Sequence, residues 1–140
     1  MTTDLRNDVT EIVLAGLREA QAQGNLPEAE VDDAVVERPN NPEHGYLSST
    51  LPLKLARQMR MNPMAIAEQI AEQIPSRGAF ERVWAARPGF INFSMGATWF
   101  QDQVAAVIAQ GDRFGHSDVG AQRKVQVEFV SVNPTGPLHV

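Results

Sequence analysis

Apolar residues recur every three to four positions in several long segments of the chain, which is the spacing of an amphipathic helix. The predicted helices are residues 5–20, 50–60, 63–74 and 97–110. Gly24 follows the first of them and Gly111 follows the last, where a glycine commonly ends a helix. Asn62 is expected to cap the third helix, because Pro63 stands directly after it at the first helical position.

Shorter runs rich in β-branched and aromatic residues predict strands between these helices. Residues 31–38 end at a proline-containing loop, and residues 80–86 and 89–95 are separated by an Arg-Pro turn, which predicts a hairpin. The pattern predicts an α+β fold in which helices pack on one face of a small, mainly antiparallel sheet. A last run, residues 124–130, either joins this sheet or opens a different fold, and we place the boundary near residues 118–123.

The composition is that of a folded globular domain, since 43% of the 140 residues are hydrophobic and 21% are charged. The chain has no cysteine, and His44, His116 and His139 lack the spacing of metal-ligand pairs, so we expect no metal site. The net charge of −5 argues against generic binding to nucleic acid, because nonspecific affinity comes from Lys and Arg. Local contact with RNA, by stacking and base-edge hydrogen bonds, stays open.

The N-terminal residues do not have the pattern of a targeting segment. Acidic side chains come early, and no long apolar core flanked by positive charge is present. No window of the sequence approaches the apolar length of a membrane span. The simplest interpretation is a cytoplasmic protein without a membrane partner, and a monomer is the favoured state.

The last residues of the chain combine a strand pattern with a rigid turn. Residues 124–130 alternate apolar and polar positions and lead into Asn-Pro-Thr-Gly-Pro, where the two prolines fix φ. Gly136 has no Cβ, so backbone amides can approach a ligand closely, while His139 is aimed from the exit of the loop. That geometry suits a phosphate or a carboxylate. Taken alone, the Pro-Thr-Gly-Pro motif is more often an ordinary strand end whose histidine has no function.

The full segment at residues 127–140, Val-Glu-Phe-Val-Ser-Val-Asn-Pro-Thr-Gly-Pro-Leu-His-Val, resembles the start of the nucleotide-binding domain of class I aminoacyl-tRNA synthetases. The version in arginyl-tRNA synthetases is the most similar. The resemblance implies that Glu128, Ser131 and Asn133 line the arginine and ATP site, and that His139 is catalytic as a donor to a phosphate oxygen. The implied cofactor is ATP with Mg²⁺ in the full enzyme, and none is expected in the fragment.

A second series of motifs, at residues 40–95, resembles the N-terminal additional domain of arginyl-tRNA synthetases. It runs Pro-Glu-His-Gly-Tyr-Leu-Ser-Ser, then Asn-Pro-Met-Ala-Ile-Ala-Glu-Gln-Ile, then Pro-Gly-Phe-Ile-Asn-Phe. The resemblance implies contact with the D-loop of tRNA(Arg) at the outer corner of the tRNA, through Phe90 and Asn92. Strand alternation places Phe90 and Asn92 on one face, where an aromatic ring can stack on a base and an amide can read its edge. The plainer alternative is that Phe90 is core and Asn92 satisfies a turn.

One stretch departs from the family's pattern. The family usually has Gly-Asp-Tyr-Ala-Ser/Thr-Asn where this chain has Gly-Tyr-Leu-Ser-Ser-Thr, so an acid and an asparagine are missing. If they cap the next helix or order the loop, Ser48 and Ser49 must do so here. Trp84 and Trp99 are expected to pack in a core, as single large aromatics usually do.

Together these motifs imply an N-terminal tRNA-contacting domain at residues 1–118. They also imply that residues 119–140 are a linker and the first, orphan strand of a Rossmann-like catalytic domain. Because a class I synthetase needs several domains, the chain is expected to be a fragment of an arginine-tRNA ligase that is inactive alone. A free-standing RNA-adaptor or protein-interaction module is the alternative, and a stop codon directly after Val140 would favour it. A small-molecule nucleotidyltransferase is a weaker option, because such enzymes place the histidine-containing turn near the N-terminus.

Overall fold

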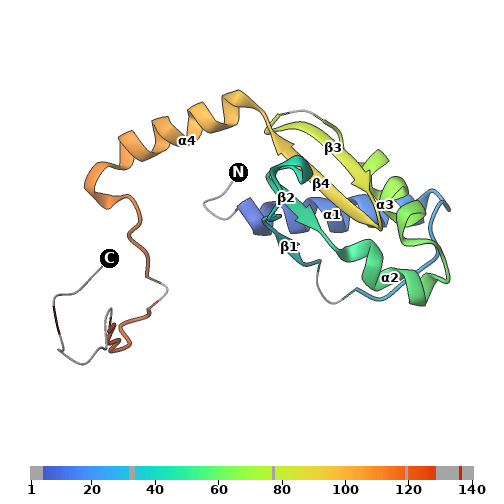
Figure 1. The fold of residues 1–140 in the computed structure, drawn as a ribbon, viewed down its shortest axis with the longest axis horizontal. Helices are drawn as coiled ribbons and strands as arrows, with labels where there is room; N and C mark the ends of the chain where they lie inside the picture. The colour runs from blue at the N-terminus through green and yellow to red at the C-terminus, as the bar shows by residue number, and fades with distance from the viewer. Residues whose placement is uncertain (1–4, 32–33, 77, 119, 129–135, 137–140) are drawn as a thin grey trace. The chain divides into compact units, whose positions relative to one another are not determined.

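The computed structural model of the protein describes residues 5–31, 34–76, 78–118, 120–128 and 136 (Figure 1). The chain divides into two compact units, Met1–Ala105 and Ala106–Val140. The first unit holds the sheet and most of the helices, and each unit is described by itself below. The proposed domain boundary near residue 118 stays a prediction.

A four-stranded antiparallel sheet forms the centre of the first unit, in the order β1-β2-β4-β3. Its strands are β1 (Val36–Glu37), β2 (Leu47–Ser49), β3 (Phe80–Ala86) and β4 (Phe90–Met95). The predicted hairpin is confirmed, because β3 and β4 pair directly across the Arg87-Pro88 turn. The predicted first strand, residues 31–38, is shortened to β1, whose register with β2 covers only Val36 and Glu37.

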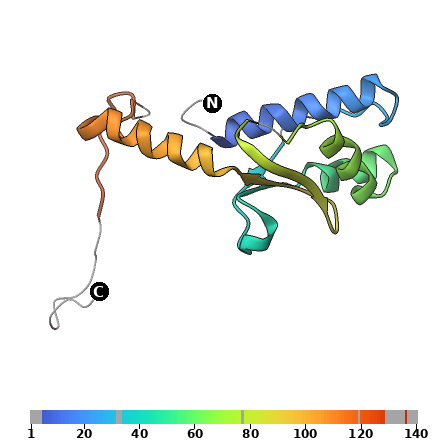
Figure 2. The same cartoon turned by 90° about the horizontal axis from the view of Figure 1, so that it is seen from above.

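Three helices pack against one face of this sheet, as the sequence predicts. They are α1 (Leu5–Ala22), α2 (Leu51–Met59) and α3 (Pro63–Glu72), and they contact the sheet strands and one another. In Figure 2, α1 and α3 lie on the same side of the sheet. The core between these layers includes Ile91 and Phe93 of β4 and Ile70 of α3, all fully buried. The α+β fold class predicted from the sequence is confirmed.

Local signals place the helix ends correctly. Asn62 caps α3 as expected, since its side-chain oxygen accepts a hydrogen bond of 2.8 Å from the Met64 backbone N–H. Gly24, beyond the end of α1, has a φ of +77°, a conformation that favours glycine. Ile66 and Ile70 of α3, and Ile74 just beyond its end, belong to the core.

The last helix, α4 (Ala97–Gln110), also has the predicted bounds, but none of its side chains is buried. Its apolar line is exposed at Phe100, Val104, Val107 and Ile108. The 3-10 turn η2 (Gly111–Arg113) follows it. The start of the helix contacts the rest of the first unit, because the ring centres of Trp99 and Phe100 lie 5.6 Å and 5.5 Å from that of Tyr46.

The predicted last strand is described only as far as Glu128. Residues 124–128 form no strand, and they do not join the four-stranded sheet. Val125 and Val127 are 75% and 65% exposed. Residues 129 and 130 of the predicted run lie outside the described residues.

Candidate nucleic-acid interface

The face of the sheet that points away from the helices, here called the outer face, carries the residues predicted to touch RNA. Strand alternation turns Ile91 and Phe93 into the core, so Phe90 and Asn92 point to the outer face. Asn92 lies directly across from Ser48 on β2 and from Trp84 on β3. These three residues form a row across neighbouring strands, defined here as the Ser48–Asn92–Trp84 row.

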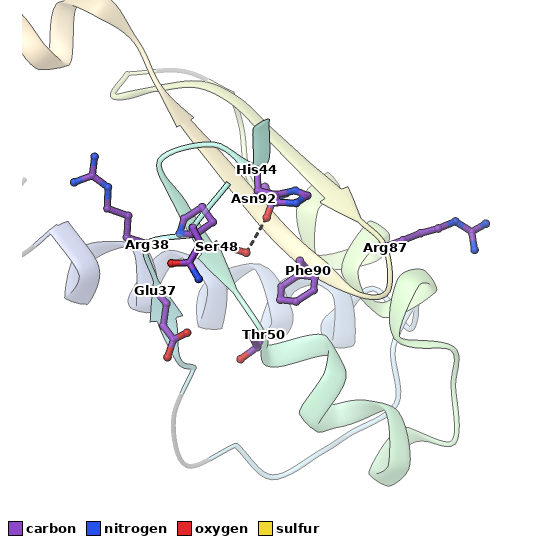
Figure 3. A pocket seen from close by; sticks show the side chains of 10 residues that line it. Glu37, Arg38, His44, Ser48, Thr50, Arg87, Phe90 and Asn92 are labelled. Atoms are coloured by element: carbon purple, nitrogen blue, oxygen red, sulfur yellow. Dashed lines mark hydrogen bonds between the residues drawn. The ribbon is translucent and has the colours of Figure 1, made fainter. Parts of the chain in front are cut away.

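A cavity of about 350 Å³ opens at the outer face (Figure 3). Its lining comes from β1 and the loop after it, from the 3-10 turn η1 (Pro42–His44), from β2, from the start of α2 and from the β3–β4 hairpin. The lining residues are Glu37, Arg38, Pro39, Asn40, His44, Ser48, Thr50, Arg87, Phe90 and Asn92. The volume is large enough for a nucleobase, and distant parts of the chain meet around it.

The amide of Asn92 is the most informative group in this cavity. Asn92 is only 1% exposed, and its Oδ1 accepts a hydrogen bond of 2.7 Å from the Ser48 hydroxyl. Its Nδ2 is buried and has no hydrogen-bond partner among the described residues. A buried donor without a partner costs about 1–3 kcal/mol, and such groups call for an explanation in a native protein. Phe90, half-buried beside it, supplies an aromatic surface.

Positively charged side chains flank the cavity although the chain carries a net charge of −5. The Arg38 guanidinium lies 4.9 Å from the centre of the Tyr46 ring, which favours one orientation of the side chain. Arg87 extends away from the cavity on another side (Figure 3). On β3, the Arg82 guanidinium lies 4.7 Å from the ring centre of Trp84. The outer face therefore offers local cations for phosphates around an aromatic and an amide.

Three residues of the segment that departs from the family's pattern form a strand. Leu47–Ser49 form β2, so the expectation of a loop at this place is wrong. Ser49 takes the capping role predicted for Ser48 or Ser49, because its hydroxyl accepts a hydrogen bond of 3.3 Å from the Leu51 backbone N–H. Thr50 makes no side-chain cap bond, and Ser48 bonds to Asn92.

Sequence reasoning missed several residues of this interface. Trp84 was expected in the core, but it lies on the outer face in register with Asn92, so that expectation is wrong. Trp99 does pack against the core, as expected. The register of the β3–β4 hairpin is the signal that could have placed Trp84 on the outer face, because it pairs Trp84 with Asn92. Ser48 could not be found in that way, since its partner lies 44 residues further along the chain.

The described residues include only one of the four residues predicted for an arginine and ATP site, so that site stays a prediction. Glu128 is exposed, and Ser131, Asn133 and His139 lie outside the described residues. Within the part of the chain that is described, no group of three or more His, Cys, Asp or Glu side chains could hold a metal ion. No described helix combines the length and apolar character needed to cross a membrane.

Comparison with known proteins gives consistent matches. The family model for "Arginyl tRNA synthetase N terminal domain" matches residues 6–95. An arginine–tRNA ligase of Dechloromonas aromatica is 40% identical over 141 residues, which cover 100% of this chain and 23% of that protein. One of Nitrosomonas europaea is 47% identical over 103 residues, which cover 74% of this chain and 18% of that protein. The chain thus spans less than a quarter of the length of these relatives.

Two solved structures share the fold. The arginyl-tRNA synthetase of Thermus thermophilus matches 71% of this chain and 15% of its own, with a TM-score of 0.57 and 22% identity. That of Plasmodium falciparum matches 71% of this chain and 17% of its own, with a TM-score of 0.59 and 15% identity. At these identities the likeness supports the α+β architecture of the first unit.

Proposed function

The chain belongs to the arginyl tRNA synthetase N terminal domain family, and from that premise we propose that it is the tRNA-contacting part of an arginine-tRNA ligase. The complete ligase would activate arginine with ATP and Mg²⁺ and esterify it to tRNA(Arg) in the cytoplasm. Residues 1–118 would form the tRNA-contacting domain and residues 119–140 the start of the catalytic domain. The chain's own contribution is the RNA contact at the outer face.

One observation carries this proposal: a buried amide donor without a partner lies beside an aromatic side chain in a cavity of nucleobase size. Proteins that recognise single-stranded RNA loops stack an extruded base on an aromatic ring and hydrogen-bond its edge. Phe90 would supply the stacking surface and Asn92 the hydrogen bond. The resemblance to arginyl-tRNA synthetases implies that this base belongs to the D-loop, so a splayed base of the tRNA D-loop is the proposed occupant.

The charge distribution suits a contact that is local and weak. A net charge of −5 gives little nonspecific attraction to phosphates, so the chain is not expected to bind RNA of any sequence. Arg38 and Arg87 flank the cavity and would contact the phosphates on either side of the bound base. Affinity would then depend on the base that enters the cavity.

The synthetic chemistry would use residues near the end of the chain. Glu128, Ser131 and Asn133 would hold arginine and ATP, and His139 would donate to a phosphate oxygen. ATP, bound with Mg²⁺, would supply the adenylyl group that is joined to the arginine carboxylate, and pyrophosphate would be the leaving group. We expect no aminoacylation by this chain alone, because only part of one pocket falls within it.

Titration of the chain with a tRNA(Arg) transcript tests the RNA contact. Phe90→Ala should weaken binding by about 1–3 kcal/mol, the usual loss when a base loses its aromatic platform. Asn92→Ala should weaken it by about 1 kcal/mol, a typical net value for a hydrogen bond. Arg18→Ala, which changes an exposed side chain on α1, is the control and should bind like the wild type. Equal binding by all four proteins would contradict the proposal.

A further inference from the structure

Arg60, directly after α2, has a backbone conformation that favours glycine. Its φ of +52° and ψ of +40° lie in the left-handed region, and among the described residues of the first unit it is the only non-glycine residue with a positive φ. A Cβ disfavours this conformation by a factor of roughly five to thirty. Because glycine is the usual residue where a helix ends in this way, the backbone does not explain why an arginine stands here.

Stabilisation of the helix does not explain Arg60 either. A cation near the C-terminus of a helix is favoured by the helix dipole, but only by a factor of about two to five. The last turn of α2 already contains a cation, Arg57. The Arg60 side chain is exposed, and it has no ion pair, ring contact or side-chain hydrogen bond among the described residues. Its guanidinium is therefore free to bind a ligand.

The sequence around Arg60 is basic although the whole chain is acidic. Residues 44–67 contain none of the 17 acidic residues, whereas Lys54, Arg57 and Arg60 lie within them. These three cations follow one another at intervals of three residues, a rise of about 4.5 Å per step along a helix, and all three are exposed. A local group of cations can attract phosphates even where the net charge of the chain is negative.

A groove connects this end of α2 with the cavity at the outer face. The groove has a volume of about 520 Å³ and is lined by residues 62–65 and Glu68 on one side and by Arg87 and Pro88 of the hairpin on the other. Arg87 also lines the cavity that contains Phe90, and its side chain extends away from that cavity (Figure 3). Arg60 comes two residues before the start of the groove. Cations therefore stand at both ends of this path.

We propose that Arg60 binds a backbone phosphate of the RNA whose base enters the cavity, and that the RNA strand passes from the cavity along the groove to the end of α2. A guanidinium suits this role because it can bind two phosphate oxygens at once. This inference rests on the proposed RNA contact. It adds a second contact surface that fixes the position of the RNA and does not depend on the base.

The test uses the 140-residue chain and a tRNA(Arg) transcript, titrated at several salt concentrations. Arg60→Asn removes the charge and places a residue that tolerates the left-handed conformation. It should weaken binding about threefold to tenfold at low salt and lower the slope of log K against log salt by about 0.7–0.9. Arg60→Lys keeps the charge and should retain the slope. Arg18→Ala removes an exposed cation of α1 and should leave the slope unchanged.

Stability separates this role from a structural one. Arg60→Asn and Arg60→Gly should have a urea midpoint no lower than that of the wild type, because both residues suit the backbone better, while both bind RNA less well. A residue that only ended the helix would show the opposite pattern, with a lower midpoint and an unchanged slope. Glu68→Gln removes the carboxylate that lines the groove and should strengthen binding about twofold.

The dependence on sequence gives a further readout. Arg60→Asn should weaken binding by the same factor for every base placed at the D-loop position that Phe90→Ala affects, because phosphates carry no sequence information. A loss that varied with the base would show that Arg60 reads a base instead.

Several outcomes would overturn the inference. An unchanged slope in both Arg60→Asn and Arg60→Gly would show that Arg60 contacts no phosphate, while weaker binding by Phe90→Ala would leave the proposed function intact. Unchanged binding by Glu68→Gln would show that the strand does not pass along the groove. Equal binding by wild type, Phe90→Ala and Asn92→Ala would refute the proposed function, and this inference with it.

Discussion

Gly45 lies where the segment containing η1 meets the outer face of the sheet, and no other residue type fits there. Its φ of +87° and ψ of −162° lie in a region used almost only by glycine. A Cβ at this position would lie 2.5 Å from the Phe93 carbonyl oxygen and 2.9 Å from Cη2 of Trp84. The neighbouring Tyr46 N–H donates to that same carbonyl at 2.7 Å. Gly45→Ala therefore strains the backbone and displaces a strand-edge hydrogen bond.

The expected magnitude follows from these two effects. The backbone conformation costs about 1–3 kcal/mol for a residue with a Cβ. Loss of the Tyr46–Phe93 hydrogen bond adds about 0.5–1.5 kcal/mol. We expect Gly45→Ala to lower the free energy of unfolding by about 2–4 kcal/mol in total. Binding of tRNA should fall too, because His44, the preceding residue, lines the cavity.

Gly24→Ala is the matched control for this prediction. Gly24 also has a positive φ, +77°, but a Cβ there meets nothing within 4 Å. The control should lose only about 1–2 kcal/mol, the cost of a left-handed conformation. Equilibrium unfolding in urea, followed by circular dichroism, measures both variants. If Gly45→Ala is no less stable than Gly24→Ala, the close approach of the backbone to β4 and Trp84 is not what restricts this position.

Two further predictions concern the helix cap and the electrostatics. Asn62→Ala removes the 2.8 Å hydrogen bond to the Met64 N–H and should lower the free energy of unfolding by about 1 kcal/mol. Asn62→Asp keeps an oxygen that can accept this bond and should retain most of the stability. An unchanged melting temperature in Asn62→Ala would contradict the cap. Arg87→Ala should reduce the slope of log K against log salt for tRNA binding by about 0.7, the value for one phosphate contact on a single strand, and Arg18→Ala should leave the slope unchanged.

Short-range signals account for the parts of the fold that the sequence predicts well. Asn62 followed by Pro63 specifies where α3 begins, and the Arg-Pro turn between two β-rich runs specifies the hairpin. In both cases the interacting residues lie close together in the sequence. The strand β2 could not be predicted in this way, because its three residues become a strand only by pairing with β1 and β4.

The candidate site, too, has a part that can be predicted from neighbouring residues and a part that depends on distant contacts. Alternation along β4 is enough to place Phe90 and Asn92 on one face, and the structure has them there. The hydrogen bond from Ser48, the position of Trp84 beside Asn92 and the cavity itself depend on how distant segments come together. Such contacts have no signature in a single sequence.

The isolation of the Asn92 amide gives the molecule a built-in spectroscopic label. A carboxamide held rigidly by one hydrogen bond and shielded from solvent should give a pair of proton resonances that is resolved from those of the exposed Asn and Gln side chains. Occupancy of the cavity would move that pair directly, with no added fluorophore. Nitrogen-15 spectra of the uniformly labelled chain would then report the binding of a nucleotide in the cavity through the resonances of Asn92 Nδ2.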